Sequence, residues 1–244
     1  MLLPLAIGAG LAAALVLASR SASAASSRQA MARLDAVVPS RRRGGASSSA
    51  PVVPFETTLV PWRTSRRTGK VERRTEVVQH LPELAAAAGR VLGRKVAPEA
   101  FALAAMAASE ARQDLAKVAI MHAAITRAGG AGGRLIALLA PGGRLGSQHG
   151  RYASTRVAPT VRDVELAEAV LAGRLANPVP GAVQWDSPAT QDRLAASGAP
   201  GYVNKDGSLR DREHVAAVRR AEGKEAVALP GIPEDEIRLW RRAA

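Results

Sequence analysis

The chain has 244 residues, no cysteine and a formal net charge of +13 at pH 7. The lack of cysteine excludes disulfides and thiolate metal sites, and the four histidines are too scattered for a local zinc motif, so we expect neither a metal nor another cofactor. Apolar residues make up 47% of the chain but aromatic residues only 3%, which favours a helical core packed through small side chains.

The positive charge is concentrated near the N-terminus. Residues 1–75 hold 12 Lys and Arg against three acidic residues, a net charge of +9, which leaves +4 for residues 76–244. A basic N-terminal segment suits an acidic polymer or anionic lipid headgroups as well as nucleic acid. Because the rest of the chain is only mildly basic, nucleic acid is not an expected partner, although DNA retention by the arginine-rich segment alone stays open.

The first segment is apolar. Residues 2–18 carry no charge and have about the minimum length of a bilayer-spanning helix. A signal peptide cleaved near Ala22-Ser23-Ala24 and a buried helix are the alternatives. Since arginines follow this run and none precedes it, we interpret residues 1–19 as an uncleaved membrane anchor in contact with the lipid bilayer. The same arginines would hold the body on the cytoplasmic side, which conflicts with an extracytoplasmic role.

Residues 20–70 are rich in Arg, Ser and Pro, a composition that predicts a flexible tether. Beyond residue 70 the spacing of apolar residues becomes helical, and no segment alternates like a strand, so we predict an all-α fold with at most a small β element. Residues 71–200 form the expected main domain and residues 201–244 a helical extension. The expected helices are roughly 72–92, 98–110, 114–128, 132–139, 161–173, 188–196, 211–221 and 234–242.

Three helix ends have recognisable signals. Asp114 is a candidate N-cap for the helix that begins there. Thr160 followed by Asp163 resembles a capping box, with Asp in place of the usual Glu or Gln. Gly173 suits the end of the same helix.

Glu110 is the candidate catalytic residue. It ends an alanine-rich run from Pro98 and shares a helical stripe with Leu103, Met106 and Ala107, so its carboxyl group should face apolar surface. Such an environment disfavours the charged form and raises the pKa, as a general acid requires. A helix-end glutamate that turns toward solvent is the alternative.

Two polar segments supply candidate substrate-binding residues. The loop 141–160 contains Ser147, Gln148 and Tyr152, which offer hydrogen-bonding groups and one aromatic ring suited to a sugar, although a solvated connector has the same composition. A second segment, 177–188, presents the triplet Gln184-Trp185-Asp186 after two prolines. Its tryptophan would stack on a sugar ring or fill the core, and its aspartate would be a second carboxylate or, as we favour, the N-cap of the next helix.

Taken in order, these residues resemble a known family. Ser109-Glu110-Ala111 ends a helix, a helix ending in Thr126-Arg127 follows, and then come the Gln148 loop and Pro-Gly-Ala-Val-Gln-Trp-Asp186. This order is similar to that of lysozyme-like cell-wall hydrolases, including lytic transglycosylases and spore-cortex-lytic enzymes, over about residues 80–190. Thr126-Arg127 departs from the usual Asn-Arg pair of that family.

The resemblance implies a lysozyme-like helical domain that cleaves the β-1,4 bond between N-acetylmuramic acid and N-acetylglucosamine in peptidoglycan. Glu110 would act alone as general acid and base, and Ser147, Gln148, Tyr152, Gln184 and Trp185 would contact the glycan strand. A hydrolase would also need a second carboxylate, for which Asp186 is a candidate. The expected location is the cell envelope or a virion membrane, with other envelope or virion proteins as partners.

A non-enzymatic function is the main alternative. A membrane-anchored structural or wall-binding protein with a degenerate lysozyme-like fold would have the same anchor, tether and helical body. The low aromatic content favours it, because saccharide clefts usually stack rings against sugars. Release of soluble fragments from peptidoglycan separates the two functions.

Overall fold

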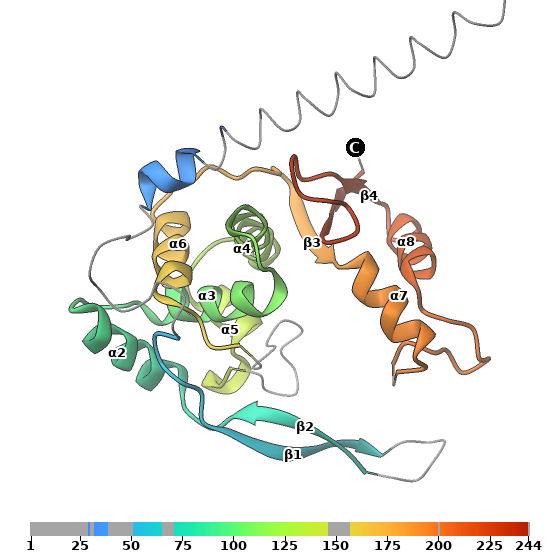
Figure 1. The fold of residues 1–244 in the computed structure, drawn as a ribbon, viewed down its shortest axis with the longest axis horizontal. Helices are drawn as coiled ribbons and strands as arrows, with labels where there is room; N and C mark the ends of the chain where they lie inside the picture. Colours follow the sequence, from blue (N-terminus) through green and yellow to red (C-terminus); the bar gives the residue numbers. More distant parts are fainter. Residues whose placement is uncertain are drawn as a thin grey trace, which may run out of the picture.

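The computed structural model describes residues 29, 32–38, 51–64, 71–145, 157–199 and 201–243. It is mostly helical, with a small three-stranded antiparallel sheet and a separate two-stranded hairpin (Figure 1). Its elements are, in chain order, β1 (Thr57–Thr64), β2 (Val71–Val77), α2 (Leu81–Leu92), α3 (Pro98–Glu110), α4 (Asp114–Ala128), α5 (Gly133–Leu139), the 3-10 turn η1 (Pro141–Gly143), α6 (Val161–Leu171), β3 (Ala182–Asp186), α7 (Pro188–Ala196), α8 (Arg212–Ala221), β4 (Lys224–Val227) and β5 (Arg238–Arg242).

Helix α3 is the centre of the helical body. It packs against α2, α4, α5 and α6, and every residue from 100 to 107 is buried (Figure 1). A helix buried on all sides must be apolar all round, and its many alanines allow the neighbouring helices to approach closely. Pro98 stands in the first turn, where its missing N–H removes no helical hydrogen bond.

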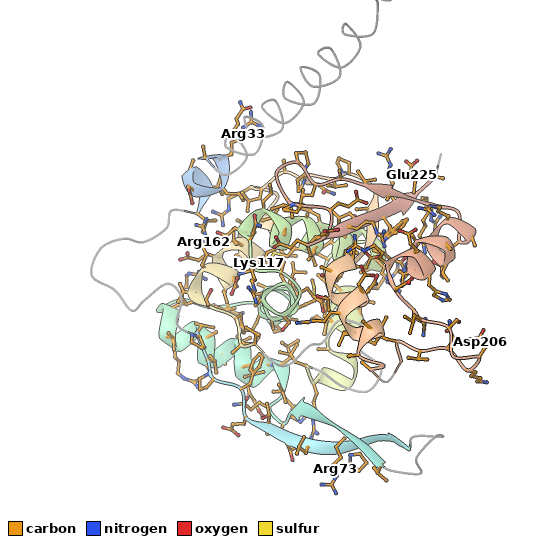
Figure 2. All side chains as sticks on the ribbon, turned by 45° about the vertical axis from the view of Figure 1, so that its right-hand side comes forward. Arg33, Arg73, Lys117, Arg162, Asp206 and Glu225 are labelled. Carbon is orange, nitrogen blue, oxygen red and sulfur yellow. The ribbon has the colours of Figure 1, made fainter. Side chains whose placement is uncertain are left out.

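Ion pairs connect α6 to the helices around it. The ammonium of Lys117 in α4 lies 2.6 Å from Oδ1 of buried Asp163. Arg162 contacts Asp114 at 2.9 Å and Asp35 at 3.0 Å, and the second contact joins the helical segment 32–37 to the body. Lys117 and Arg162 lie on neighbouring parts of the body in Figure 2.

The hairpin corrects two predictions. Residues 72–77 form part of β2 and not the start of a helix, and residues 57–64, predicted as tether, form β1. The two strands pair antiparallel, with a register shift between Pro61 and Arg63. Proline is tolerated in a strand at such an irregularity because it has no N–H to donate. The buried side chains of Val52 and Val53 also place this part of the predicted tether in the core.

The sheet corrects the prediction of a helix at 234–242. Its strand order is β3-β5-β4, so β5, near the C-terminus, pairs with β3 on one side and β4 on the other. The region 201–244 therefore adds one helix and two strands, and its strands complete the sheet that carries Trp185. The expectation that any sheet would be small is confirmed.

One of the three predicted helix-end signals differs from what is observed, and two agree. Gln113, and not Asp114, is the N-cap of α4, because the carboxylate of Asp114 is paired with Arg162. Thr160 and Asp163 form the predicted capping box, and Gly173 adopts the left-handed conformation after α6 (φ 68°).

The predicted anchor, residues 2–18, lies outside the described residues. Within the part of the chain that is described, no helix has the length and apolar character needed to cross a bilayer.

Candidate functional site

Glu110 lies where the buried helix α3 ends. It is the last residue of α3, and Ala111 after it is extended, so the chain turns here toward α4. The glutamate is only partly exposed, and Leu103, Met106 and Ala107, which share its helix stripe, are almost wholly buried. The side chain of Glu110 therefore faces apolar surface, as its position in the helix predicted.

Burial raises the pKa of the Glu110 carboxyl above its ordinary value of 4.5. Removal from water disfavours the carboxylate, and a hydrogen bond from Trp185 opposes this effect without cancelling it. The C-terminal end of α3 has no basic residue in its last turn, so the partial negative charge of the helix end acts in the same direction as burial. The group is thus a proton donor at a higher pH than a solvated glutamate.

Trp185 holds this carboxyl in place. Its indole Nε1 donates a hydrogen bond to Oε2 of Glu110 at 3.2 Å, from strand β3 to the end of α3. The indole is buried, which agrees with a core position. Because one contact both satisfies the indole N–H and orients the carboxyl, Trp185 positions the proposed acid as well as filling the core.

Asp186 is bound within the sheet and is not a cap. The N-cap of α7 is Ser187, so the predicted capping role of Asp186 is wrong. Its carboxylate accepts hydrogen bonds from Arg238 at 3.1 and 3.3 Å and from the indole of Trp240 at 2.8 Å. The guanidinium of Arg238 also lies 4.8 Å from the Trp240 ring centre. With these contacts the carboxylate stabilises the pairing of β3 and β5.

The other predicted acidic residues are also paired. Asp163 accepts from the backbone and hydroxyl of Thr160 as well as from Lys117, and Asp114 binds Arg162. Such contacts stabilise the folded helices and give each of these carboxylates a cationic partner. Glu110 differs from them because its contact in the described chain is with a neutral donor.

The turn after α3 is bordered by two segments that sequence reasoning did not connect to it. The hydroxyl of Ser109 donates to the carbonyl of Val157 at 3.5 Å, and the amide of Gln113 donates to Glu236 at 2.9 Å. Glu236 is therefore a further carboxylate held near the end of α3. Its position follows from a contact across 123 residues, and no local signal in the sequence indicates it.

Gln184 lines a hollow at the end of the sheet. The hollow has a volume of about 610 Å³ and is also lined by Thr126, Arg127, Gly181, Val183, Lys224, Arg241 and Arg242. Gln184 is only 8% exposed, and its Oε1 has no hydrogen-bond partner among the described residues. The structure therefore brings Gln184 and the Thr126-Arg127 pair together, at the end of α4 that is remote from Glu110.

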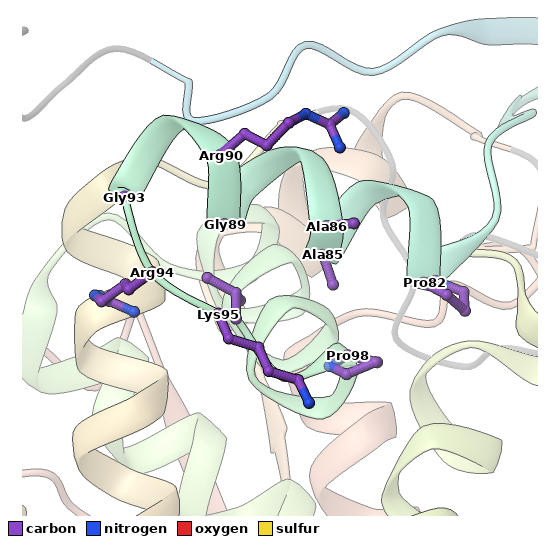
Figure 3. A pocket seen from close by; sticks show the side chains of 10 residues that line it. Pro82, Ala85, Ala86, Gly89, Arg90, Gly93, Arg94, Lys95 and Pro98 are labelled. Carbon is purple, nitrogen blue, oxygen red and sulfur yellow. The ribbon is translucent and has the colours of Figure 1, made fainter.

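Another hollow, of about 600 Å³, lies between α2 and the turn that leads into α3 (Figure 3). Its lining includes Arg90, Arg94 and Lys95, and Arg94 is paired with Glu168. None of the described residues that line this hollow has a carboxyl group, so they offer no general acid of the kind that Glu110 provides. Glu110 is not among the described residues that line either of these two hollows.

Ser147, Gln148 and Tyr152 lie outside the described residues, and their role in substrate binding stays a prediction. No group of three or more His, Asp or Glu side chains in the described ranges is arranged to bind a metal ion. No protein-family model matches the chain, and neither the curated proteins nor the solved structures contain a significant match. The functional argument therefore depends on the site residues themselves.

Proposed function

We propose that the protein is a muramidase or lytic transglycosylase that cleaves the β-1,4 bond between N-acetylmuramic acid and N-acetylglucosamine in peptidoglycan. The observation that supports this proposal most is the buried carboxyl of Glu110, whose pKa is raised and whose orientation is set by Trp185. The lysozyme-like order of residues around it, from Ser109 to Asp186, gives the substrate class. The lysozyme-like fold is part of the same proposal.

In the first step the protonated Glu110 gives its hydrogen to the glycosidic oxygen as the bond from that oxygen to C1 of the muramic residue breaks. Positive charge then develops at C1. Because its pKa is raised, the Glu110 carboxyl keeps this hydrogen at a higher pH than an ordinary glutamate does. The leaving N-acetylglucosamine departs with a new hydroxyl group.

In the second step the Glu110 carboxylate takes the hydrogen of the muramic C6 hydroxyl while that oxygen bonds to C1. The product is a 1,6-anhydro ring, no water is consumed, and the enzyme regains its proton. This route needs no second carboxylate. The ion pairs of Asp186, Asp163 and Asp114 favour it, because each of these carboxylates already has a cationic partner.

The proposal includes a position at the cell envelope or in a virion membrane. The apolar segment 2–18 would be the anchor and would place the helical body near the wall polymer. A wall-opening enzyme of a virus particle and a wall-remodelling enzyme of a cell would both use this arrangement. Other envelope or virion proteins are the expected neighbours.

The test is digestion of purified peptidoglycan by the full chain, followed by mass spectrometry of the soluble products. Anhydro ends indicate the transglycosylase route and reducing ends, one water heavier, indicate hydrolysis.

Glu110→Gln should lower product release by at least about 100-fold, the size of a general-acid contribution. Glu99→Gln, at the opposite end of the same helix, is the matched control and should retain activity. Product release by Glu110→Gln at the wild-type rate would refute the assignment.

Binding to peptidoglycan without any soluble product from the wild-type chain would support the non-catalytic alternative. Centrifugation of the digestion mixture measures both binding and cleavage, because bound protein sediments with the insoluble polymer and cleaved fragments stay in solution. The Glu110→Gln variant should still sediment with the polymer if it retains its binding surface.

A further inference from the structure

A short N-terminal segment, residues 32–38, lies against the helical body. Residues 32–37 are helical, and Leu34 and Val38, one turn apart, are each only 4% exposed. Val37 is partly buried against the same apolar core, so these three residues form one apolar stripe. Figure 1 shows the segment in blue beside α6. We call residues 32–38 the strap.

One ion pair among the described residues joins the strap to α6. Oδ1 of Asp35 lies 3.0 Å from the guanidinium of Arg162, and Figure 2 labels Arg162 close to the strap. Arg162 also contacts Asp114 of α4 at 2.9 Å, and the side chain of Asp35 is 53% exposed. If the strap leaves, Arg162 therefore keeps a carboxylate partner and Asp35 becomes fully solvated. Departure of the strap strands no buried charge.

The chain is fixed to the body a second time at residues 51–53. The backbone N–H of Val52 donates to the carbonyl of Pro159 at 2.8 Å, and Val52 and Val53 are buried. This attachment does not involve the strap, so the chain from residue 51 onward can stay in place when the strap leaves. The sequence 39–50 between them consists of Pro, Ser, Arg, Gly and Ala, and so adds no large apolar side chain to the contact of the strap.

The attachment of the strap is weak for its length. Two buried side chains and a half-exposed ion pair must offset the ordering of the whole segment, and exposed ion pairs contribute little. We propose that the strap is a releasable contact that sets the reach between the N-terminal apolar segment and the body. With the strap docked, residues 19–31 connect the two and span at most about 45 Å. With the strap released, residues 19–50 span at most about 110 Å.

The consequence for reach rests on the proposed function, in which residues 2–18 are the membrane anchor. A docked strap would hold the body close to the bilayer. A released strap would let Glu110 reach glycan strands about twice as far from the membrane. Docking and release of the strap depend on neither the anchor nor catalysis.

The distance between two spin labels tests the release. The chain has no cysteine, so Ala36→Cys in the strap and Ala172→Cys after α6, both at exposed positions, allow specific labelling of the full-length protein. In detergent solution we expect a narrow population at short distance for the docked strap and a broad population at longer distance for the released strap. Added salt should increase the released population, because it screens the pair of Asp35 and Arg162.

Leu34→Ala and Leu84→Ala make the same change in the strap and in the core of α2. Leu34→Ala should raise the ratio of released to docked protein at least about tenfold and leave the melting midpoint nearly unchanged, because the strap lies outside the cooperative core. Leu84→Ala, at a position only 1% exposed, should lower the midpoint and leave the ratio unaltered. Arg33→Gln, at an exposed position of the strap, is the charge control and should change neither quantity.

Energy transfer in vesicles tests the reach. A donor dye on Ala172→Cys and acceptor dyes on the headgroups of phosphatidylethanolamine–phosphatidylglycerol vesicles report how close the body lies to the bilayer. Leu34→Ala should show weaker transfer than the protein with the native strap. Equal transfer in the two proteins would reject the effect on reach, and no transfer in either would reject the reach together with the anchor.

A single short distance between the spin labels, both with the native strap and in Leu34→Ala, would overturn the proposal. A fall in the melting midpoint of Leu34→Ala as large as that of Leu84→Ala would overturn it too, because the strap would then be a fixed part of the core. Docking and release in a chain that frees no glycan fragments would retain the releasable strap and reject the catalytic function. Glycan release by a chain whose strap never leaves the body would do the reverse.

Discussion

Oε2 of Glu110 and Nε1 of Trp185 lie 3.2 Å apart and join the end of the central helix to the edge of the sheet across 75 residues of chain. The indole donates and the carboxyl accepts, so the contact favours the ionised form, while burial of the same carboxyl favours the protonated form. Burial is the larger effect. The site therefore holds a carboxyl that is both oriented and protonated at a higher pH than usual, which are two separate requirements of a general acid.

Replacement of Glu110 by glutamine should stabilise the fold at neutral pH. Because the pKa of Glu110 is raised in the folded state, the folded protein binds more protons than the unfolded chain above about pH 4.5, and stability is lost as pH rises from there through the folded pKa. The amide cannot ionise and removes this loss. Thermal melting of Glu110→Gln and the wild type should therefore give similar midpoints at pH 4 and a higher midpoint for the variant at pH 8.

A variant midpoint below that of the wild type at pH 8 would contradict a raised pKa at this position. Glu99→Gln is again the control, and the difference between its melting midpoint and that of the wild type should not change sign with pH. An acid that lowers stability where it is ionised is a common feature of active sites, which retain such groups for their chemistry.

Trp185→Phe should move the pH dependence of activity upward. Phenylalanine keeps an aromatic ring in the core but has no N–H, and the hydrogen bond that it removes is the one that lowers the pKa of Glu110. The alkaline limb of the pH profile, where the acid loses its proton, should therefore shift to higher pH. Rates of glycan release between pH 4 and pH 9 measure this shift, and a limb that stays in place or moves to lower pH would contradict the action of the indole on Glu110.

The helical elements that surround the site were predictable because their signals are local. Pro98 and Pro188 begin α3 and α7, alanine-rich runs follow, and the predicted bounds 98–110 and 188–196 agree with the structure. The burial of Glu110 followed from the same local pattern. For these elements the residues within one or two turns determine the conformation.

The strands and the contacts between distant residues were not predictable in this way. β5 has five residues, three of them arginine, and it becomes a strand because Arg238 and Leu239 pair with Asp186 and Trp185 in β3. Those partners lie 52 or more residues away, so no local periodicity indicates the pairing. The partners of Glu110 and of Gln113 depend on the same folding of the C-terminal region back onto the body.

Asp186→Asn should reduce stability far more than activity. The substitution keeps a side chain of the same shape but leaves the buried guanidinium of Arg238 without its charged partner, at a cost of about 3–5 kcal/mol. Urea unfolding measures the loss. At a temperature where the variant is folded, its rate of glycan release should stay within about threefold of the wild type. A folded Asp186→Asn protein without activity would instead make Asp186 the second carboxylate of a hydrolase.

Glu236→Gln tests whether Glu110 acts alone. Glu236 lies near the end of α3, forms no ion pair with a described residue, and accepts a hydrogen bond from Gln113 at Oε2, so it is a further carboxylate in this region that could activate water. The new amide oxygen can still accept the bond from Gln113, so the fold should be preserved. The single-acid route predicts glycan release within about threefold of the wild type and unchanged anhydro products. A loss comparable to that of Glu110→Gln, with reducing ends among the wild-type products, would establish a two-carboxylate hydrolase in which Glu236 acts as the base.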